Sequence, residues 1–228
     1  FGERETGAVG IRAAALARRR YGAPSRSLAD PACESRRSSV KLLAVSDYAD
    51  ALRTRVREIP VAPPPPPWVA VPAIPVGGLT NVGIDGSNGL ELVLTISHAG
   101  RGVFNTRGDR LARDDQEPSD SWLDEVGLEA GGIGPLAERR VRIAGLAGGG
   151  LPTITRDGWH VRNLPVDWPD DFVVLEPPGC GALWTGHQSG CVAVFARDEC
   201  ELRAFGFSPS GRVLVLASSG DLRLYVRE

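Results

Sequence analysis

Three cysteines and one histidine near the C-terminus have the residue types and spacing of a candidate metal site. Cys180, His187, Cys191 and Cys200 follow the pattern C-x6-H-x3-C-x8-C. Zn²⁺ accepts three thiolates and one imidazole in tetrahedral geometry, so these side chains could bind zinc. The common C-x2-C pair is absent, and the same residues also fit a disulfide or free thiols in strands and turns. We expect no cofactor unless these four residues bind zinc.

Patterns for other catalytic chemistry are incomplete in this chain. Ser97 and His98 are adjacent, so on a strand they would point to opposite faces, and no G-x-S-x-G turn is present to hold a nucleophilic serine. The glycine-rich run at 145–152 lacks the Gly-Lys-Ser/Thr ending of a phosphate-binding loop. We therefore expect a protein that is not an enzyme.

Aromatic, histidine and arginine residues in expected turns are the candidates for binding. Tryptophan and arginine are favoured anchors in protein interfaces because they combine a large apolar surface with hydrogen-bond donors. We expect two exposed turns, around 98–101 and 159–162, to contact a protein partner. The candidate partner-binding residues are His98, Arg101, Trp159, His160 and Arg162.

Short β-strands separated by turns are the elements that must position these residues. From residue 76 onward, apolar and β-branched runs alternate with Gly, Asn, Asp and Pro turns, a spacing typical of a sandwich, barrel or propeller. Within this stretch, only 119–128 has the pattern of a helix. The expected strands include 90–97, 102–105, 110–112, 140–144, 152–155, 158–161, 172–175, 182–185 and 191–195.

The C-terminal segment has the cadence of a repeat. From Cys200 it reads CELRAFGFSPSGRVLVLASSGDLRLYVRE, with turns at 208–211 and 219–221 between three strands. This cadence resembles a WD-type β-propeller repeat, and weaker versions occur at 90–111 and 181–205. The resemblance implies a small or incomplete β-propeller whose surface binds other proteins. The Trp-Asp dipeptide of the family is absent and only about four blades are available, so a β-sandwich is the alternative.

Composition divides the chain into three parts. Residues 1–60 carry 12 Lys and Arg against 7 Asp and Glu, and we expect a basic leader with helices at 7–20 and 47–58 and a short strand at 41–46. Residues 61–75 include five consecutive prolines, which favour an extended linker or a strap laid across the body. Residues 76–228 form the all-β body.

Charge and hydropathy limit the kinds of partner. The formal net charge is −2, which argues against nucleic acid because phosphate binding needs a basic surface. No apolar run is long enough to span a membrane, and no secretory signal precedes the body. We expect a soluble intracellular protein, cytoplasmic or, if the arginine-rich segment 8–20 derives from a transit peptide, in an organelle.

These observations favour a non-catalytic protein-binding or structural subunit of a larger protein assembly. The basic leader, the proline-rich segment and the incomplete β repeat are each easier to explain if a neighbouring protein is present. Two alternatives remain open from the residues alone. One is a metal-assisted hydrolase centred on the segment 180–200, and the other is a small immunity or regulatory protein that binds a single target.

Overall fold

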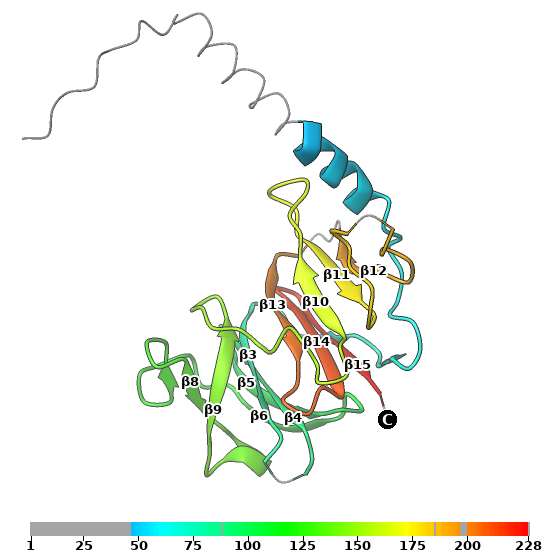
Figure 1. The fold of residues 1–228 in the computed structure, drawn as a ribbon. Helices are drawn as coiled ribbons and strands as arrows, with labels where there is room; N and C mark the ends of the chain where they lie inside the picture. Colours follow the sequence, from blue (N-terminus) through cyan, green and yellow to red (C-terminus); the bar gives the residue numbers. More distant parts are fainter. Residues whose placement is uncertain (1–46, 88, 185, 197–199, 228) are drawn as a thin grey trace, which may run out of the picture. The chain divides into compact units, whose positions relative to one another are not determined.

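A computed structural model describes residues 47–227 apart from 88, 185 and 197–199 (Figure 1). Contacts divide the chain into residues 1–45 and 46–228, so the described residues all belong to the second unit. The division therefore falls before the helix expected at 47–58, which is present at 47–57. The helix expected at 7–20 and the strand at 41–46 lie outside the described residues.

The fold is mainly β, as the sequence predicts. The largest sheet has seven antiparallel strands in the order β6-β5-β4-β3-β9-β8-β7, and a short 3-10 helix, η1 (Gly134–Leu136), precedes β9. Its strands are β3 (Leu79–Asp85), β4 (Leu92–Ser97), β5 (Gly100–Asn105), β6 (Arg110–Asp114), β7 (Leu123–Asp124), β8 (Glu129–Gly131) and β9 (Arg140–Gly145).

The other strands form two smaller antiparallel sheets. The first has the order β10-β11-β12, and the second has the order β1-β15-β14-β13 with β2 also paired to β15. The strands are β10 (His160–Asn163), β11 (Phe172–Glu176), β12 (Val192–Ala196), β13 (Leu202–Phe207), β14 (Val213–Ser218), β15 (Asp221–Val226), β1 (Val69–Ala70) and β2 (Ile74–Pro75). The second sheet thus combines two strands that precede the seven-stranded sheet in the sequence, β1 and β2, with the three C-terminal strands.

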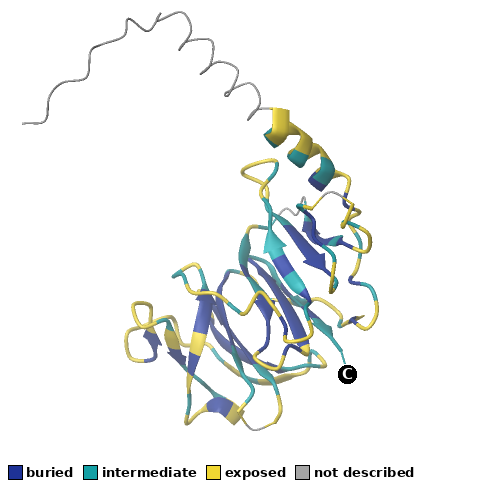
Figure 2. Cartoon of the chain, viewed as in Figure 1, coloured by how far each residue is buried: buried dark blue, intermediate teal, exposed yellow. Residues whose placement is uncertain are grey.

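The sheet that contains β14 is the middle layer of the stack. Every residue of β14 is buried, and successive side chains of a strand point to opposite faces. Val213, Val215 and Ala217 pack with residues of the seven-stranded sheet. Leu214 and Leu216 pack with the three-stranded sheet. Figure 2 shows the buried residues concentrated in these central strands.

The outer layers are covered in two different ways. The far face of the three-stranded sheet is covered by Val56 at the end of the helix and by Ile59 just after it, which pack against Val174 and Ala193. The seven-stranded sheet curls and covers its own far face, so that Leu94 of β4 packs in one cluster with residues of β7, β8 and β9. The helix therefore covers the far face of the three-stranded sheet, whereas the seven-stranded sheet covers its own far face by curling.

The proline-rich segment lies against the body. β1 and β2 pair with β15, and Val61 forms a bridge with Ala193 of β12. Trp68 is 5% exposed and belongs to the core between the three-stranded and five-stranded sheets. Residues 61–75 thus form a strap rather than a free linker.

Three expected elements are wrong. Residues 119–128 form turns and β7 instead of a helix, because the Asp124 carboxylate accepts hydrogen bonds from the backbone N–H groups of Val126 and Gly127. Such local bonds compete with helical ones. The strand expected at 182–185 is a turn over 182–184, and the strand expected at 152–155 is a loop with one isolated bridge, between Ile154 and His160.

One long strand has no clear signal in the sequence. β3 contains Asn81 and Gly83, which interrupt its apolar pattern. Gly83 is needed because a Cβ at this position would lie 2.6 Å from the carbonyl oxygen of Arg142 in β9.

In the described part of the chain, no helix is long and apolar enough to cross a membrane.

Candidate functional site

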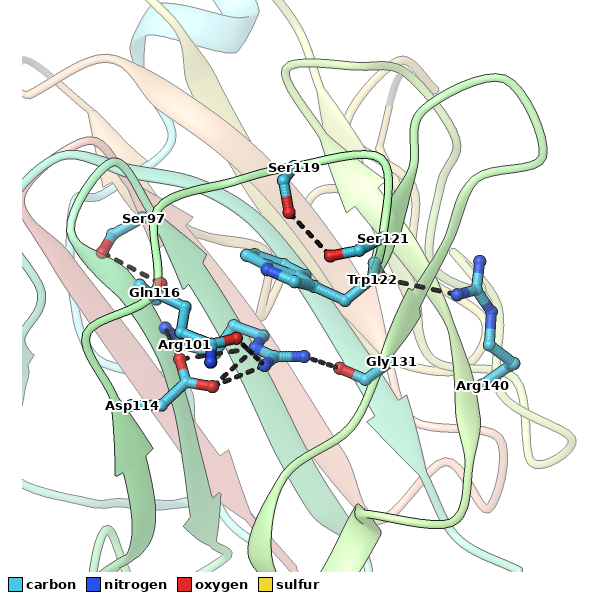
Figure 3. Close-up of polar contacts among 10 residues, drawn as sticks. Ser97, Arg101, Asp114, Gln116, Ser119, Ser121, Trp122, Gly131 and Arg140 are labelled. Atoms are coloured by element: carbon cyan, nitrogen blue, oxygen red, sulfur yellow. Dashed lines mark hydrogen bonds and ion pairs between the residues drawn. The ribbon is translucent and has the colours of Figure 1, made fainter.

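Arg101, expected in an exposed turn, is buried. Its side chain is 7% exposed, forms an ion pair with Asp114 and donates a hydrogen bond from Nη1 to the carbonyl oxygen of Gly131 at 2.7 Å. The guanidinium carbon lies 4.1 Å from the ring centre of Trp122 (Figure 3). Its expected exposure is wrong because the curl of the seven-stranded sheet encloses this face of β5.

Trp159 is also buried, with 6% of its surface exposed. Its ring packs edge-on against Trp68, with ring centres 5.6 Å apart. The residue precedes β10, and its side chain enters the core between two sheets instead of facing solvent. In the first of the two turns expected to contact a partner, around 98–101, His98 is exposed and lies beside Gly78.

His160 and Arg162 do reach the surface, where they line one pocket. The pairing of β10 with β11 puts His160 opposite Glu176, and alternation along β10 places His160 and Arg162 on the same face. The loop after β11 supplies the other wall. The pocket, of about 300 Å³, is lined chiefly by His160, Arg162, Glu176, Cys180, Leu183 and Trp184, and we call it the His160 pocket.

An ion pair forms the polar wall of the His160 pocket. Arg162 Nε lies 3.0 Å from Oε2 of Glu176, whose side chain is 3% exposed while that of Arg162 is 42% exposed. The backbone N–H of Ala182 donates to Glu176 Oε1 at 3.0 Å. The exposed part of this ion pair is therefore the Arg162 guanidinium. The Glu176 carboxylate is buried and accepts hydrogen bonds from Arg162 and from the backbone of Ala182.

The imidazole of His160 is oriented by the same arginine. Arg162 Nη2 lies 3.2 Å from His160 Nδ1. A guanidinium has only donors, so Nδ1 must be the acceptor and Nε2 carries the ring proton. Trp184 is 61% exposed at the rim and packs edge-on against His187, with ring centres 6.1 Å apart. The pocket thus offers an indole surface and nitrogen donors side by side.

The four candidate zinc ligands do not form a metal site. Cys180 lines the pocket with Sγ 2.9 Å from the carbonyl oxygen of Ser189, and Cys191 is buried beneath the helix. Cys200 lies against Gly220, where an added Cβ would be 2.6 Å from its sulfur. No disulfide joins the described cysteines to one another. Among residues 47–227, outside the gaps, no group of three His, Cys, Asp or Glu side chains could hold a metal ion.

The buried thiol of Cys191 gives a test of this part of the structure. Burial, and then the nearby Glu176 and Cys180, raise the pKa of Cys191 from its ordinary 9.0 to about 11. We expect iodoacetamide at about pH 8 to modify Cys180 and spare Cys191 in the folded protein, because the thiolate is the reactive form. Mass spectrometry of the alkylated peptides measures this, and equal labelling of both thiols would contradict it.

The same shift fixes the direction of a pH effect on stability. Between about pH 9 and pH 11 the Cys191 thiol loses its proton in the unfolded chain but keeps it in the folded protein. The free energy of unfolding therefore falls as pH rises from about 9 towards 11. A Cys191→Val variant should lose this part of the pH dependence, which urea titrations at two pH values would show.

Two residues of the pocket were missed in the sequence. Glu176 ends an otherwise apolar strand, FVVLE, and a lone charge at the end of a buried run is a signal that it needs a partner. Trp184 lies in what was expected to be a strand, where a tryptophan would pack in the core. Nothing in the sequence marks it as exposed.

Comparisons with protein-family models, curated proteins and solved structures give no match for this chain.

Proposed function

We propose that this chain is a non-catalytic protein-binding or structural subunit of a larger assembly, and that its contact surface is centred on the His160 pocket. The observation that carries the proposal is the position of Trp184, an indole 61% exposed at the rim of a pocket that also presents the guanidinium of Arg162. Exposed tryptophan and arginine beside a concave surface are typical of the residues that dominate binding energy in protein interfaces.

Charge favours a protein partner over a nucleic acid. The exposed cation of the pocket is already paired with Glu176, and the formal net charge of the chain is −2. Binding a phosphate backbone requires several basic side chains that can each neutralise a phosphate. A partner that inserts an apolar or aromatic side chain beside Trp184, and accepts hydrogen bonds from Arg162, fits this surface better.

Capture of partners by tagged full-length protein tests the proposal. We expect Trp184→Ala to weaken binding of the captured partner at least about tenfold, since a tryptophan anchor contributes about 2 kcal/mol or more. Tyr48→Ala is the matched control, because Tyr48 is 64% exposed on the helix and lies outside the pocket. Equal binding by the two variants, or purification from the source only as a monomer without other proteins, would contradict the proposal.

A further inference from the structure

A second exposed tryptophan lies at the other end of the three-stranded sheet. Residues 164–171 connect β10 to β11, and we call them the hairpin tip; Figure 1 shows this yellow loop projecting beyond the strands. Trp168 is 83% exposed, more than any other large hydrophobic side chain of the described residues except Val126. An indole in this position is costly to keep in water and available for contact.

The hairpin tip is braced by polar contacts. Arg57 Nε lies 3.1 and 3.2 Å from the two carboxylate oxygens of Asp167, and the Asp170 N–H donates to the Asp167 carbonyl oxygen at 3.0 Å. At the base, Asn163 Nδ2 donates to Asp171 at 2.6 Å. Because the loop is already held in one geometry, little conformational entropy would be lost when Trp168 is buried in an interface.

The tip carries net negative charge, and the His160 pocket, among its described residues, exposes a single cation, that of Arg162. Three carboxylates at the tip, those of Asp167, Asp170 and Asp171, adjoin one guanidinium, that of Arg57, so the tip carries net negative charge. The pocket instead exposes the guanidinium of Arg162 and buries the carboxylate that pairs with it. The contribution of charge is therefore local: one carboxylate of the tip can approach the exposed guanidinium of Arg162 and help to orient the two surfaces.

The size of the His160 pocket also suits the indole ring of Trp168. The pocket volume of about 300 Å³ lies at the lower end of the range for pockets that hold whole small molecules, so it has room for one indole ring. Trp184 supplies an aromatic partner, and indole rings pack favourably edge-to-face or offset.

The two surfaces cannot meet within one molecule. In the β10–β11 pair, His160 lies opposite Glu176 at the pocket end, whereas Asn163 lies opposite Val173 at the tip end. The length of the sheet therefore separates pocket and tip. A contact between them must join different copies head to tail, which is a heterologous interface that can extend to further copies or close into a ring.

We propose that the His160 pocket of one chain binds the hairpin tip of a second copy, with Trp168 entering beside Trp184 and Asp170 near Arg162. The inference rests on the proposed function, because it names an occupant for the same pocket. It predicts self-association that rises with concentration and weakens with added salt, since part of the attraction is between exposed charges.

Complementation between two variants of the full-length chain tests the proposal by light scattering after size-exclusion chromatography. Wild-type protein is expected to increase in mean mass with concentration, whereas Trp168→Ala and Trp184→Ala should each stay at 24.2 kDa. Mixing the two should restore a one-to-one dimer, because one variant keeps the pocket and the other keeps the tip. Tyr48→Ala, in a side chain outside both surfaces, should associate like wild type.

Three results would overturn self-association through these surfaces. They are a wild-type monomer at every soluble concentration, unchanged association of Trp168→Ala, or no dimer in the mixture. Failure here is distinguishable from failure of the proposed function. If wild type is monomeric but Trp184→Ala still loses another captured protein, the pocket binds a different partner and the proposed function stands.

Discussion

Replacing Arg101 with alanine is expected to lower the free energy of unfolding by about 4 kcal/mol, close to the cost of removing one partner from a buried ion pair. The Asp114 side chain, 24% exposed, would keep its charge in a largely enclosed position after losing the guanidinium. The carbonyl oxygen of Gly131 would lose its side-chain donor, and the ring of Trp122 would lose the cation that covers it.

The size of this effect follows from where the contacts of Arg101 lead. Arg101 belongs to β5, Asp114 to β6 and Gly131 to β8, while Trp122 lies in the loop before β7. β6 and β7 are at the two ends of the strand order in this sheet, so the side chain bridges the two edges of the curl. Loss of Arg101 therefore weakens the closure of the sheet as well as one ion pair.

Arg113→Ala is the matched control on the neighbouring strand. Arg113 also pairs with an aspartate, Asp115, but the two side chains are 54% and 76% exposed. Exposed pairs of this kind contribute at most about 1 kcal/mol. Urea unfolding followed by circular dichroism measures both variants, with Arg101→Lys as an intermediate that keeps the charge and loses the fork geometry. Equal losses for Arg101→Ala and Arg113→Ala would show that the buried network is not stabilising.

The sequence predicts the strands better than it predicts which residues they bury. β4, β5, β9, β11, β12 and the C-terminal hairpins lie where alternation and turn residues place them, and the helix at 47–57 ends one residue early. These elements are set by local patterns of two to six residues. The curl of the large sheet depends on contacts between segments distant in the chain, so the enclosure of Arg101 has no local signal.

Layering explains the other errors about exposure. In a stack of sheets both faces of a central strand are buried, so alternation no longer separates core from surface. Trp159 and His160 are neighbours beside the same turn, yet the first enters the core and the second lines the pocket. Among the residues that line the pocket, His160 and Arg162 were therefore expected from residue type, while Glu176 and Trp184 required the fold.

Replacing Trp159 with alanine is expected to cost about 4 kcal/mol, within the range for truncating a buried tryptophan. Its ring packs edge-on against Trp68, which stacks on Phe207 with ring centres 5.6 Å apart. Arg227 completes the series, 4.8 Å from the Trp68 ring centre. The Trp159 ring therefore helps to hold the strap against both the three-stranded and the five-stranded sheet. Its loss leaves a cavity that the neighbouring rings cannot fill.

A double-mutant cycle separates this role from one in binding. Trp159→Ala and Trp68→Ala should interact by about 1 kcal/mol in unfolding free energy, as packed aromatic pairs do. Trp168→Ala, which removes a ring 83% exposed, should change stability by less than about 0.5 kcal/mol. Loss of a protein complex in Trp159→Ala would then report lower stability rather than a lost contact, and Trp184→Ala is the variant that reports on the pocket. An unfolding free energy of Trp159→Ala equal to that of the wild type would contradict this account of the core.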